Sequence, residues 1–121
     1  MANVEQKLDW GRSTTTFSGL KKVEERRVHS EGINEICPKR MITLHQHQYD
    51  NEEYTILTEG LKVIIIPSEE AKKLKNEEVL KLLKEQKSLS VGEKIVCPKR
   101  YAHALYNSSN NIGRFEFCKY Y

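Results

Sequence analysis

The sequence predicts an all-β fold, a small antiparallel sandwich or barrel, with one helical insertion at about residues 68–87. Most of the chain divides into short runs that alternate in polarity or are rich in β-branched residues, and Gly, Pro and Asn separate these runs. One stretch, by contrast, is dense in Glu, Lys and Leu and contains neither Gly nor Pro. At 121 residues the chain has the length of one domain, so we expect residues 1–121 to form a single unit.

The predicted strands follow one another along the chain. In the run 41–47, Met41, Thr43, His45 and His47 share one face, because successive side chains of a strand point to opposite sides. Thr58-Glu59-Gly60 separates two runs as a hairpin turn does. We expect strands at 14–17, 22–29, 41–47, 54–57, 61–66, 91–96, 102–106 and 114–120.

The helical insertion has the end signals of an α-helix. Ser68 is a candidate N-cap, acidic residues follow it, and Lys84 and Lys87 suit the C-terminal end of the helix dipole. A second short helix that begins at Asn76 is the alternative. The segment is interpreted either as an insertion with a solvated charged face or as a lid or dimer contact. Its candidate apolar stripe comprises Leu74, Val79, Leu82 and Leu83.

Charge and hydropathy exclude two classes of partner. The 20 Lys+Arg and 17 Asp+Glu nearly balance at a net charge of +3, and six of the 14 lysines lie among glutamates between residues 69 and 87, which argues against nucleic-acid binding. The longest apolar run, 63–66, is far too short to span a bilayer, so we expect no membrane partner. Because the N-terminus does not resemble a secretion signal, we expect a soluble cytoplasmic protein.

The three cysteines are not spaced as metal ligands. Cys37, Cys97 and Cys118 form no C-x-x-C pair, and in a reducing compartment they are interpreted as small buried side chains. The alternative is a redox pair between Cys37 and Cys97, each of which precedes Pro-Lys-Arg.

Three of the four histidines stand in positions that suit a metal site. His45 and His47 are two residues apart on one predicted strand, so both rings point to the same face. The pair Glu52 and Glu53 follows closely, and His103 lies on another predicted strand. Three imidazoles and a carboxylate suit one divalent ion of iron, manganese, zinc, nickel or cobalt. The alternative for an isolated H-x-H pair is two surface or core histidines without a metal.

The spacing around these residues resembles that of the cupin family. The stretch 45–60 is similar to the first cupin motif, H-x-H, then Glu, then six residues, then Gly. The second motif, G-x5-P-x-G-x2-H-x3-N, is matched at its required intervals by Gly92, Pro98, His103 and Asn107. The resemblance covers residues 36–117, with motif 1 at 39–60 and motif 2 at 92–107. It implies a jelly roll, a small antiparallel β-barrel, with a mononuclear metal site in its mouth and pairing into a homodimer.

Two glycines of the cupin motifs are replaced in this sequence. Lys39 stands where the first motif begins with Gly, and Arg100 stands where the second has Gly after Pro98. We expect a different turn geometry, or a backbone with negative φ, at both positions. The alternative role for these basic side chains is to hold an anionic substrate.

Two adjacent glutamates, Glu52 and Glu53, are alternatives for the carboxylate ligand of the site. Glu52 keeps the family's distance from His47, whereas Glu53 keeps its distance from Gly60. A loop absorbs an extra residue more easily than a strand does, so we predict Glu53 as the ligand and place Glu52 in the loop or facing outward. Thr55 and Leu57 would then face the interior beside Glu53.

The segment 42–63 resembles the cupins of sugar-phosphate metabolism, and the type II mannose-6-phosphate isomerases in particular. This implies an isomerase or epimerase whose metal polarises a small carbohydrate or sugar phosphate. The alternatives are a mononuclear iron dioxygenase and a non-catalytic sugar-binding cupin. His29 is interpreted as an unremarkable surface or interface histidine. Candidate catalytic residues are Glu52 and Tyr106, and candidate substrate-binding residues are Lys39, Arg100, Thr55 and Asn107.

Overall fold

A computed structural model describes residues 3–121. No helix in this part of the chain is long and apolar enough to cross a membrane. Its elements are β1 (Val4–Leu8), β2 (Gly11–Val23), β3 (Arg26–Ile36), β4 (Met41–Gln46), β5 (Asn51–Ile56), β6 (Leu61–Pro67), α1 (Ser68–Ala71), α2 (Asn76–Glu85), β7 (Lys94–Cys97), β8 (Tyr101–Asn107) and β9 (Gly113–Tyr120).

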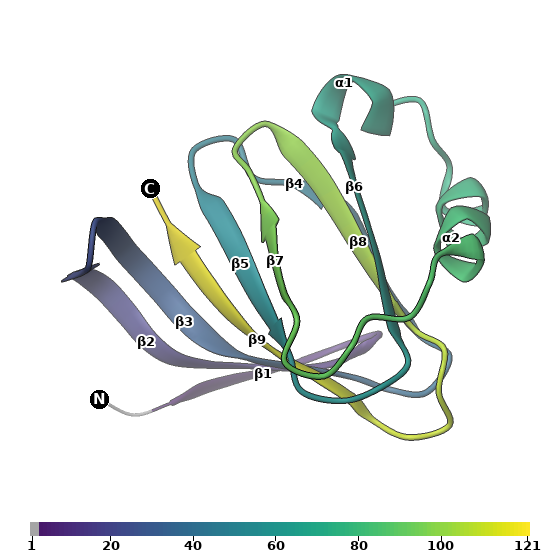
Figure 1. Cartoon of the computed structure of the whole chain (residues 1–121), viewed down its shortest axis with the longest axis horizontal. Helices are drawn as coiled ribbons and strands as arrows, with labels where there is room; N and C mark the ends of the chain where they lie inside the picture. Colours follow the sequence, from purple (N-terminus) through teal and green to yellow (C-terminus); the bar gives the residue numbers. More distant parts are fainter. Residues whose placement is uncertain (1–2) are drawn as a thin grey trace.

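The strands form two antiparallel sheets, as Figure 1 shows. The six-stranded sheet has the order β1-β2-β3-β9-β5-β7, and the three-stranded sheet has the order β4-β8-β6. Apart from β1-β2-β3, neighbouring strands are not consecutive in the sequence, as is typical of a jelly roll. The predicted fold class, an antiparallel jelly roll with a helical insertion, is confirmed.

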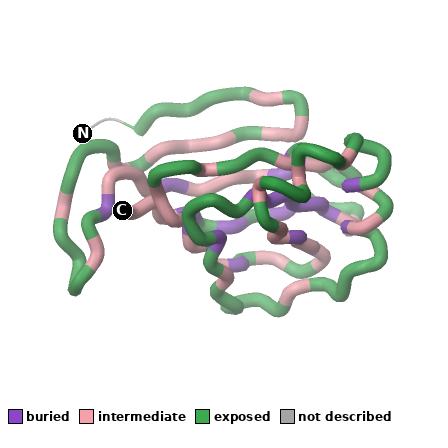
Figure 2. The backbone as a smooth tube through the Cα atoms, turned by 90° about the horizontal axis from the view of Figure 1, so that it is seen from above, coloured by how far each residue is buried: buried purple, intermediate pink, exposed green. Residues whose placement is uncertain are grey.

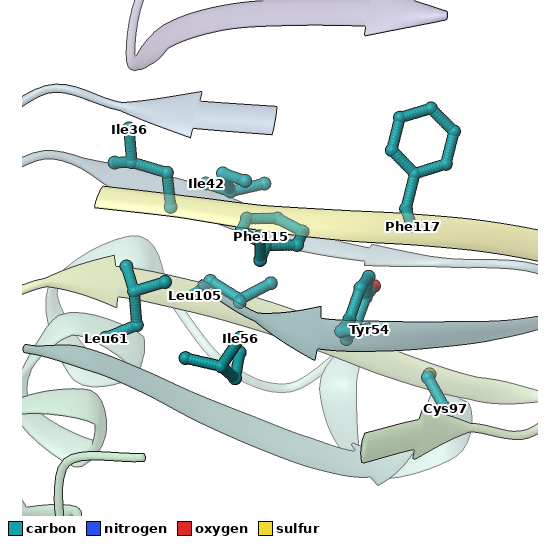
Figure 3. Packing of buried hydrophobic residues seen from close by; sticks show 9 residues of the cluster. All are labelled: Ile36, Ile42, Tyr54, Ile56, Leu61, Cys97, Leu105, Phe115 and Phe117. Atoms are coloured by element: carbon teal, nitrogen blue, oxygen red, sulfur yellow. The ribbon is translucent and has the colours of Figure 1, made fainter. Parts of the chain in front are cut away.

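The core lies between the two sheets. Alternate side chains of β5 and β9 point into it, because one face of each strand is buried and the other is not. Figure 2 shows that the buried positions gather where the sheets overlap, whereas β1 is largely exposed. The buried apolar cluster, shown in Figure 3, comprises Ile36, Ile42, Tyr54, Ile56, Leu61, Cys97, Leu105, Phe115 and Phe117.

The helical insertion covers the outer face of the three-stranded sheet. Val79 and Leu83 of α2 are fully buried and pack with Ile64, Ala104 and Tyr106 of that sheet. The insertion contains two helices, the second of which begins at Asn76, as the alternative prediction had it. The predicted N-cap is wrong, because Ser68 is already helical and its hydroxyl donates to the Arg100 carbonyl at 2.8 Å.

Two predicted strand connections are also wrong. The expected strand 22–29 is interrupted by the turn between β2 and β3. Residues 58–60 do not close a hairpin, because β5 and β6 belong to different sheets and this turn crosses from one to the other. Local sequence shows that a turn is present but does not show which strand the next one pairs with.

A β-bulge in β4 changes which of its side chains face the interior. Ile42 lies opposite Leu105 and His45 lies opposite His103, so β4 has one residue more than β8 between these pairs. An extra residue reverses the alternation of a strand. Ile42 therefore packs in the core before the bulge, Met41 packs on the helix side, and Thr43 is exposed. The prediction that Met41 and Thr43 share the inner face with His45 is wrong for this reason.

Lys39 and Arg100 adopt a backbone conformation that glycine favours. Their φ angles are +61° and +69°, in the left-handed region that non-glycine residues rarely adopt. The expected negative φ is therefore wrong at both positions. Backbone hydrogen bonds hold these turns, since Lys39 N donates to Asn107 O at 2.9 Å and Arg100 N donates to His47 O at 3.0 Å.

Restoring glycine at position 100 should therefore stabilise the protein. Relief of the left-handed strain is worth about 1–2 kcal/mol, and the greater freedom of glycine in the unfolded chain offsets part of it. We expect Arg100→Gly to raise the free energy of unfolding by about 0.5–1 kcal/mol, measured by urea denaturation. Lys99→Gly is the matched control, because Lys99 has no positive φ, and it should destabilise. Equal destabilisation by both variants would contradict the strain argument.

Candidate metal centre

Four side chains converge at the end of the sandwich where β9 and the described chain end. In Figure 1 this end of β9 carries the label C. His45 comes from β4, His47 from the loop that follows it, Glu52 from β5 and His103 from β8. One nitrogen of each imidazole and one oxygen of the carboxylate all lie within 4.8 Å of one another. His103 and Glu52 are buried, whereas His45 is exposed, so one side of the cluster is open to solvent. This group of side chains can hold a metal ion.

The ligand atoms face one another at short distances. His45 Nε2 lies 2.7 Å from His103 Nε2. Glu52 Oε1 lies 3.0 Å from His47 Nε2 and 3.5 Å from His103 Nε2. The bulge in β4 contributes directly to this geometry, because it brings His45 directly opposite His103 across the two strands.

Each imidazole is oriented by a partner on its other nitrogen. His45 Nδ1 donates to the Thr43 carbonyl at 2.9 Å, which leaves Nε2 as the lone-pair nitrogen. His47 Nδ1 lies 3.2 Å from Asp50 Oδ1. His103 Nδ1 contacts the hydroxyl of Tyr54. Such partners fix the ring orientation and tautomer of histidines that bind metals.

The hydrogen bonds of the cluster leave nitrogen lone pairs without a proton donor, as a metal site does. The Tyr54 hydroxyl donates to Glu52 at 3.0 Å, so we assign the Nδ1 proton of His103 to the Tyr54 oxygen. The Nε2 lone pairs of His45 and His103 then face each other without a proton between them. The Nε2 atom of His47 is also buried and accepts or donates no well-oriented hydrogen bond. Three imidazole nitrogens and a carboxylate are a suitable set for iron, manganese, zinc, nickel or cobalt.

The pKa shifts of the cluster favour the protonation states that bind cations. Burial lowers the pKa of His103 to about 3, and partial desolvation of the His45 ring by its neighbours lowers the pKa of His45, so both imidazoles are neutral near pH 7. Burial alone would raise the pKa of Glu52, but the close contact with His47 and the neighbouring charges outweigh it, and the pKa is lowered. Neutral imidazoles and an ionised carboxylate need not lose protons before a metal binds.

Neither a protein-family model nor a curated protein matches the sequence of this chain. Solved structures do match its structure. CapF of Staphylococcus aureus, a capsular polysaccharide assembling protein, matches with a TM-score of 0.64 at 14% identity, over 98% of this chain and 30% of CapF. The cupin domain of Schizosaccharomyces pombe Cnp3 gives 0.61 at 8% identity, over 93% of this chain and 63% of that chain. A predicted oxalate decarboxylase of Thermotoga maritima gives 0.60 at 12% identity, over 98% and 90%.

This chain has the cupin fold. It spans about a third of CapF and less than two thirds of the Cnp3 chain. The likeness is one of fold, so the chemistry of the site must be argued from its own residues.

The structure places Glu52, and not Glu53, in the cluster with the three histidines. The prediction of Glu53 as the carboxylate ligand is therefore wrong. Side chains alternate along β5, and Tyr54 and Ile56 point into the core together with Glu52. Glu53 points to the outer face, where its carboxylate pairs with Arg26 at 2.9 Å. The residue that is extra to the cupin spacing therefore lies after β5, in the turn that ends at Gly60. The alternation of Tyr54 and Ile56 with Glu52 was the sequence signal that could have identified the inward face.

Neither of the two candidate catalytic residues, Glu52 and Tyr106, is free to act as a base. Glu52 lies in the cluster itself. Tyr106 lies on the opposite face of β8 from His103, in the layer under α2, with the Lys84 ammonium 6.0 Å from its ring centre. An odd separation of three residues along a strand puts Tyr106 and His103 on opposite faces.

The substrate-binding candidates do not gather around the cluster. Thr55 shares the outer face of β5 with Glu53. Asn107 is buried at the other end of the sandwich, where its amide donates to Ile36 O at 2.9 Å and Asn111 O at 2.7 Å and so fastens the adjoining loops. Lys39 lies at that end too, and its ammonium donates to Ser108 O. Arg100 lies near the site only through its backbone bond to His47.

Sequence reasoning missed two residues at this site and the contacts of a third. Asp50 bridges His47 and His29, with its Oδ2 2.8 Å from His29 Nε2, so His29 is not an isolated surface histidine. Tyr54 is buried and contacts both Glu52 and His103. Lys119 of β9 lies directly opposite Glu52. The position of Asp50 three residues after His47 was visible in the sequence, whereas the other two placements depend on strand pairing.

The thiols take no part in the site. All three cysteines are free; Cys97 is buried, but Cys37 is exposed, contrary to expectation, and the two form no disulfide. Burial, together with the negative charges of Glu52 and Asp50, raises the pKa of Cys97 to about 12. Cys97 is therefore a packing residue, since its reactive thiolate form is absent near neutral pH.

Removing the carboxylate that orients His47 should weaken metal binding. We expect Asp50→Asn to lower the affinity for Zn²⁺ or Mn²⁺ by about 10–100-fold, because partners of metal-binding histidines typically contribute that much. Competition with a chromophoric chelator measures the affinity. Asp9→Asn is the matched control, since Asp9 lies in the turn between β1 and β2, and it should leave the affinity unchanged. An unchanged affinity in Asp50→Asn would show that Asp50 does not support the centre.

Proposed function

We propose that this chain is a metal-dependent cupin enzyme of the isomerase or epimerase class, acting on a small open-chain carbohydrate or sugar phosphate. The observation that carries the proposal is the convergence of His45, His47, His103 and Glu52 at an open end of the fold. The description of CapF as a capsular polysaccharide assembling protein supports a carbohydrate substrate.

The metal, once bound, would polarise the carbonyl and the adjacent hydroxyl of an open-chain sugar and so lower the pKa of the C–H bond between them. The residues of the chain have separate parts in this scheme. The carboxylate of Glu52 offsets one positive charge of the ion. Tyr54 and Asp50 hold Glu52, His103 and His47 in position through the contacts described above. The exposed side of His45 leaves the centre open to a ligand.

The test is isomerisation in deuterated water. Metal-loaded protein is incubated without oxygen with mannose 6-phosphate or fructose 6-phosphate, and NMR follows interconversion and deuterium incorporation at C2. We expect turnover with several divalent metals and none in His103→Ala. Oxygen consumption that requires ferrous iron would instead identify a dioxygenase. A rise in melting temperature on sugar addition without turnover would identify a binding protein and overturn the enzymatic proposal.

A further inference from the structure

Lys119 presents a positive charge inside the mouth of the fold, beside the metal centre. Its direct cross-strand neighbours are Glu52 on β5 and Ser30 on β3. The register of β9 with β5 is unbroken from Phe115 to Tyr120, so Lys119 shares the inner face with Phe115 and Phe117. The ammonium lies 5.5 Å from the centre of the Phe117 ring, which confirms that the side chain points inward.

The ammonium of Lys119 has no anionic partner among the ion pairs formed within residues 3–121. Its nearest acidic neighbour along the sheet, Glu52, is already engaged by His47, His103 and Tyr54. The charge of Lys119 nevertheless reaches the cluster, since it contributes to lowering the pKa of Glu52, His45 and His103. An inward-facing lysine without a counter-ion, next to a ligand-binding centre, is suited to an anion.

We propose that Lys119 binds the anionic group of the ligand, so that the centre takes small organic anions that carry a carboxylate or a phosphoryl group. The inference rests on the proposed metal-dependent function and narrows its substrate class. A divalent ion with one carboxylate and three neutral imidazoles keeps one positive charge, and Lys119 adds a second. Asp50 does not offset these charges at the ligand, because it is turned toward His47 and His29.

The geometry also limits the size of the ligand. Residues directly opposite each other in antiparallel strands have Cβ atoms about 5 Å apart. Lys119 and the metal ligand Glu52 are such a pair. The Lys119 side chain and the metal ligands therefore start close enough together to contact one small ligand at the same time. This assigns to Lys119 the anion-binding role that the sequence suggested for Lys39 and Arg100.

Calorimetry with matched ligand pairs tests the inference. Zn²⁺ affinity is measured first, and Zn²⁺-loaded protein is then titrated with glycerol 3-phosphate against glycerol and with lactate against lactamide. We expect wild type to prefer at least one of the anions over its neutral partner, and Lys119→Met to lose about tenfold or more of that preference while retaining Zn²⁺. A loss confined to one pair tells whether the group is a phosphate or a carboxylate.

Two further variants make the result specific. Lys119→Arg keeps the charge and should keep the preference, which separates charge from folding. Lys94→Met removes a lysine from the outer face of the same sheet and should change nothing. Zn²⁺ binding without any preference for anions, or a preference that survives in Lys119→Met, overturns this inference alone. Absence of Zn²⁺ binding in wild type overturns the proposed function together with it.

Discussion

Replacing Glu52 by Gln should remove high-affinity binding of divalent metals, whereas replacing Glu53 by Gln should leave it intact. The two glutamates are adjacent, and the substitutions are chemically identical. They differ in the face of β5 on which they lie: Glu52 faces His47 and His103, and Glu53 pairs with Arg26 outside. We expect the loss in Glu52→Gln to exceed the roughly 10–100-fold that is typical of outer partners of metal ligands.

The measurement is a chelator competition with Zn²⁺ or Mn²⁺ on both variants, with their melting temperatures recorded in the metal-free state. Glu53→Gln should bind metal within about threefold of wild type, because its lost ion pair is partly exposed and contributes little. If Glu53→Gln loses the metal and Glu52→Gln retains it, the strand register described here is wrong by one residue.

The metal-free protein should lose stability as the pH falls from 7 to 5. Burial holds the pKa of folded His103 at about 3, against an ordinary value of 6.5. Below pH 6.5 the unfolded chain therefore binds a proton that the folded protein does not, and the stability present above this pH is progressively lost down to about pH 3. The slope approaches about 1.4 kcal/mol per pH unit, so the expected loss at pH 5 is about 2 kcal/mol from His103 alone.

The lowered pKa of His45 acts in the same direction, and the lowered pKa of Glu52 adds a further loss only below its ordinary value of 4.5. Urea denaturation in the presence of a chelator, at several pH values from 7 to 5, measures the effect. His103→Gln should show a clearly shallower slope, because its side chain does not titrate. A wild-type stability that is constant over this range, or an equal slope in the variant, would contradict a buried neutral His103.

Local pattern in the sequence was sufficient for much of the fold. Runs such as 61–66 and 114–120 coincide with β6 and β9 to within a residue at each end, and the Glu- and Lys-rich segment is helical. The N-terminal strand β1 was missed, because its exposed residues show no alternation of burial for a pattern to report. The pairing of β5 and β6 with different partners was also beyond local sequence.

At the site, spacing was sufficient to find His45, His47 and His103 but not to choose the carboxylate. The choice between Glu52 and Glu53 depended on where one extra residue is accommodated, and the structure accommodates it in the turn after β5. The bulge in β4 and the placement of Lys119 opposite Glu52 both arise from registers between strands distant in the sequence. No single-strand pattern contains that information.

The most direct test of the metal centre is the metal content of chelator-free protein after titration with a divalent ion. We expect close to one equivalent per chain in wild type, with a rise in melting temperature, and no retained metal in His47→Ala or His103→Ala. His29→Ala, which removes the one histidine outside the cluster, should retain the equivalent. A wild-type protein that takes up no metal, or histidine variants that retain it, would contradict the assignment of these side chains to a metal centre.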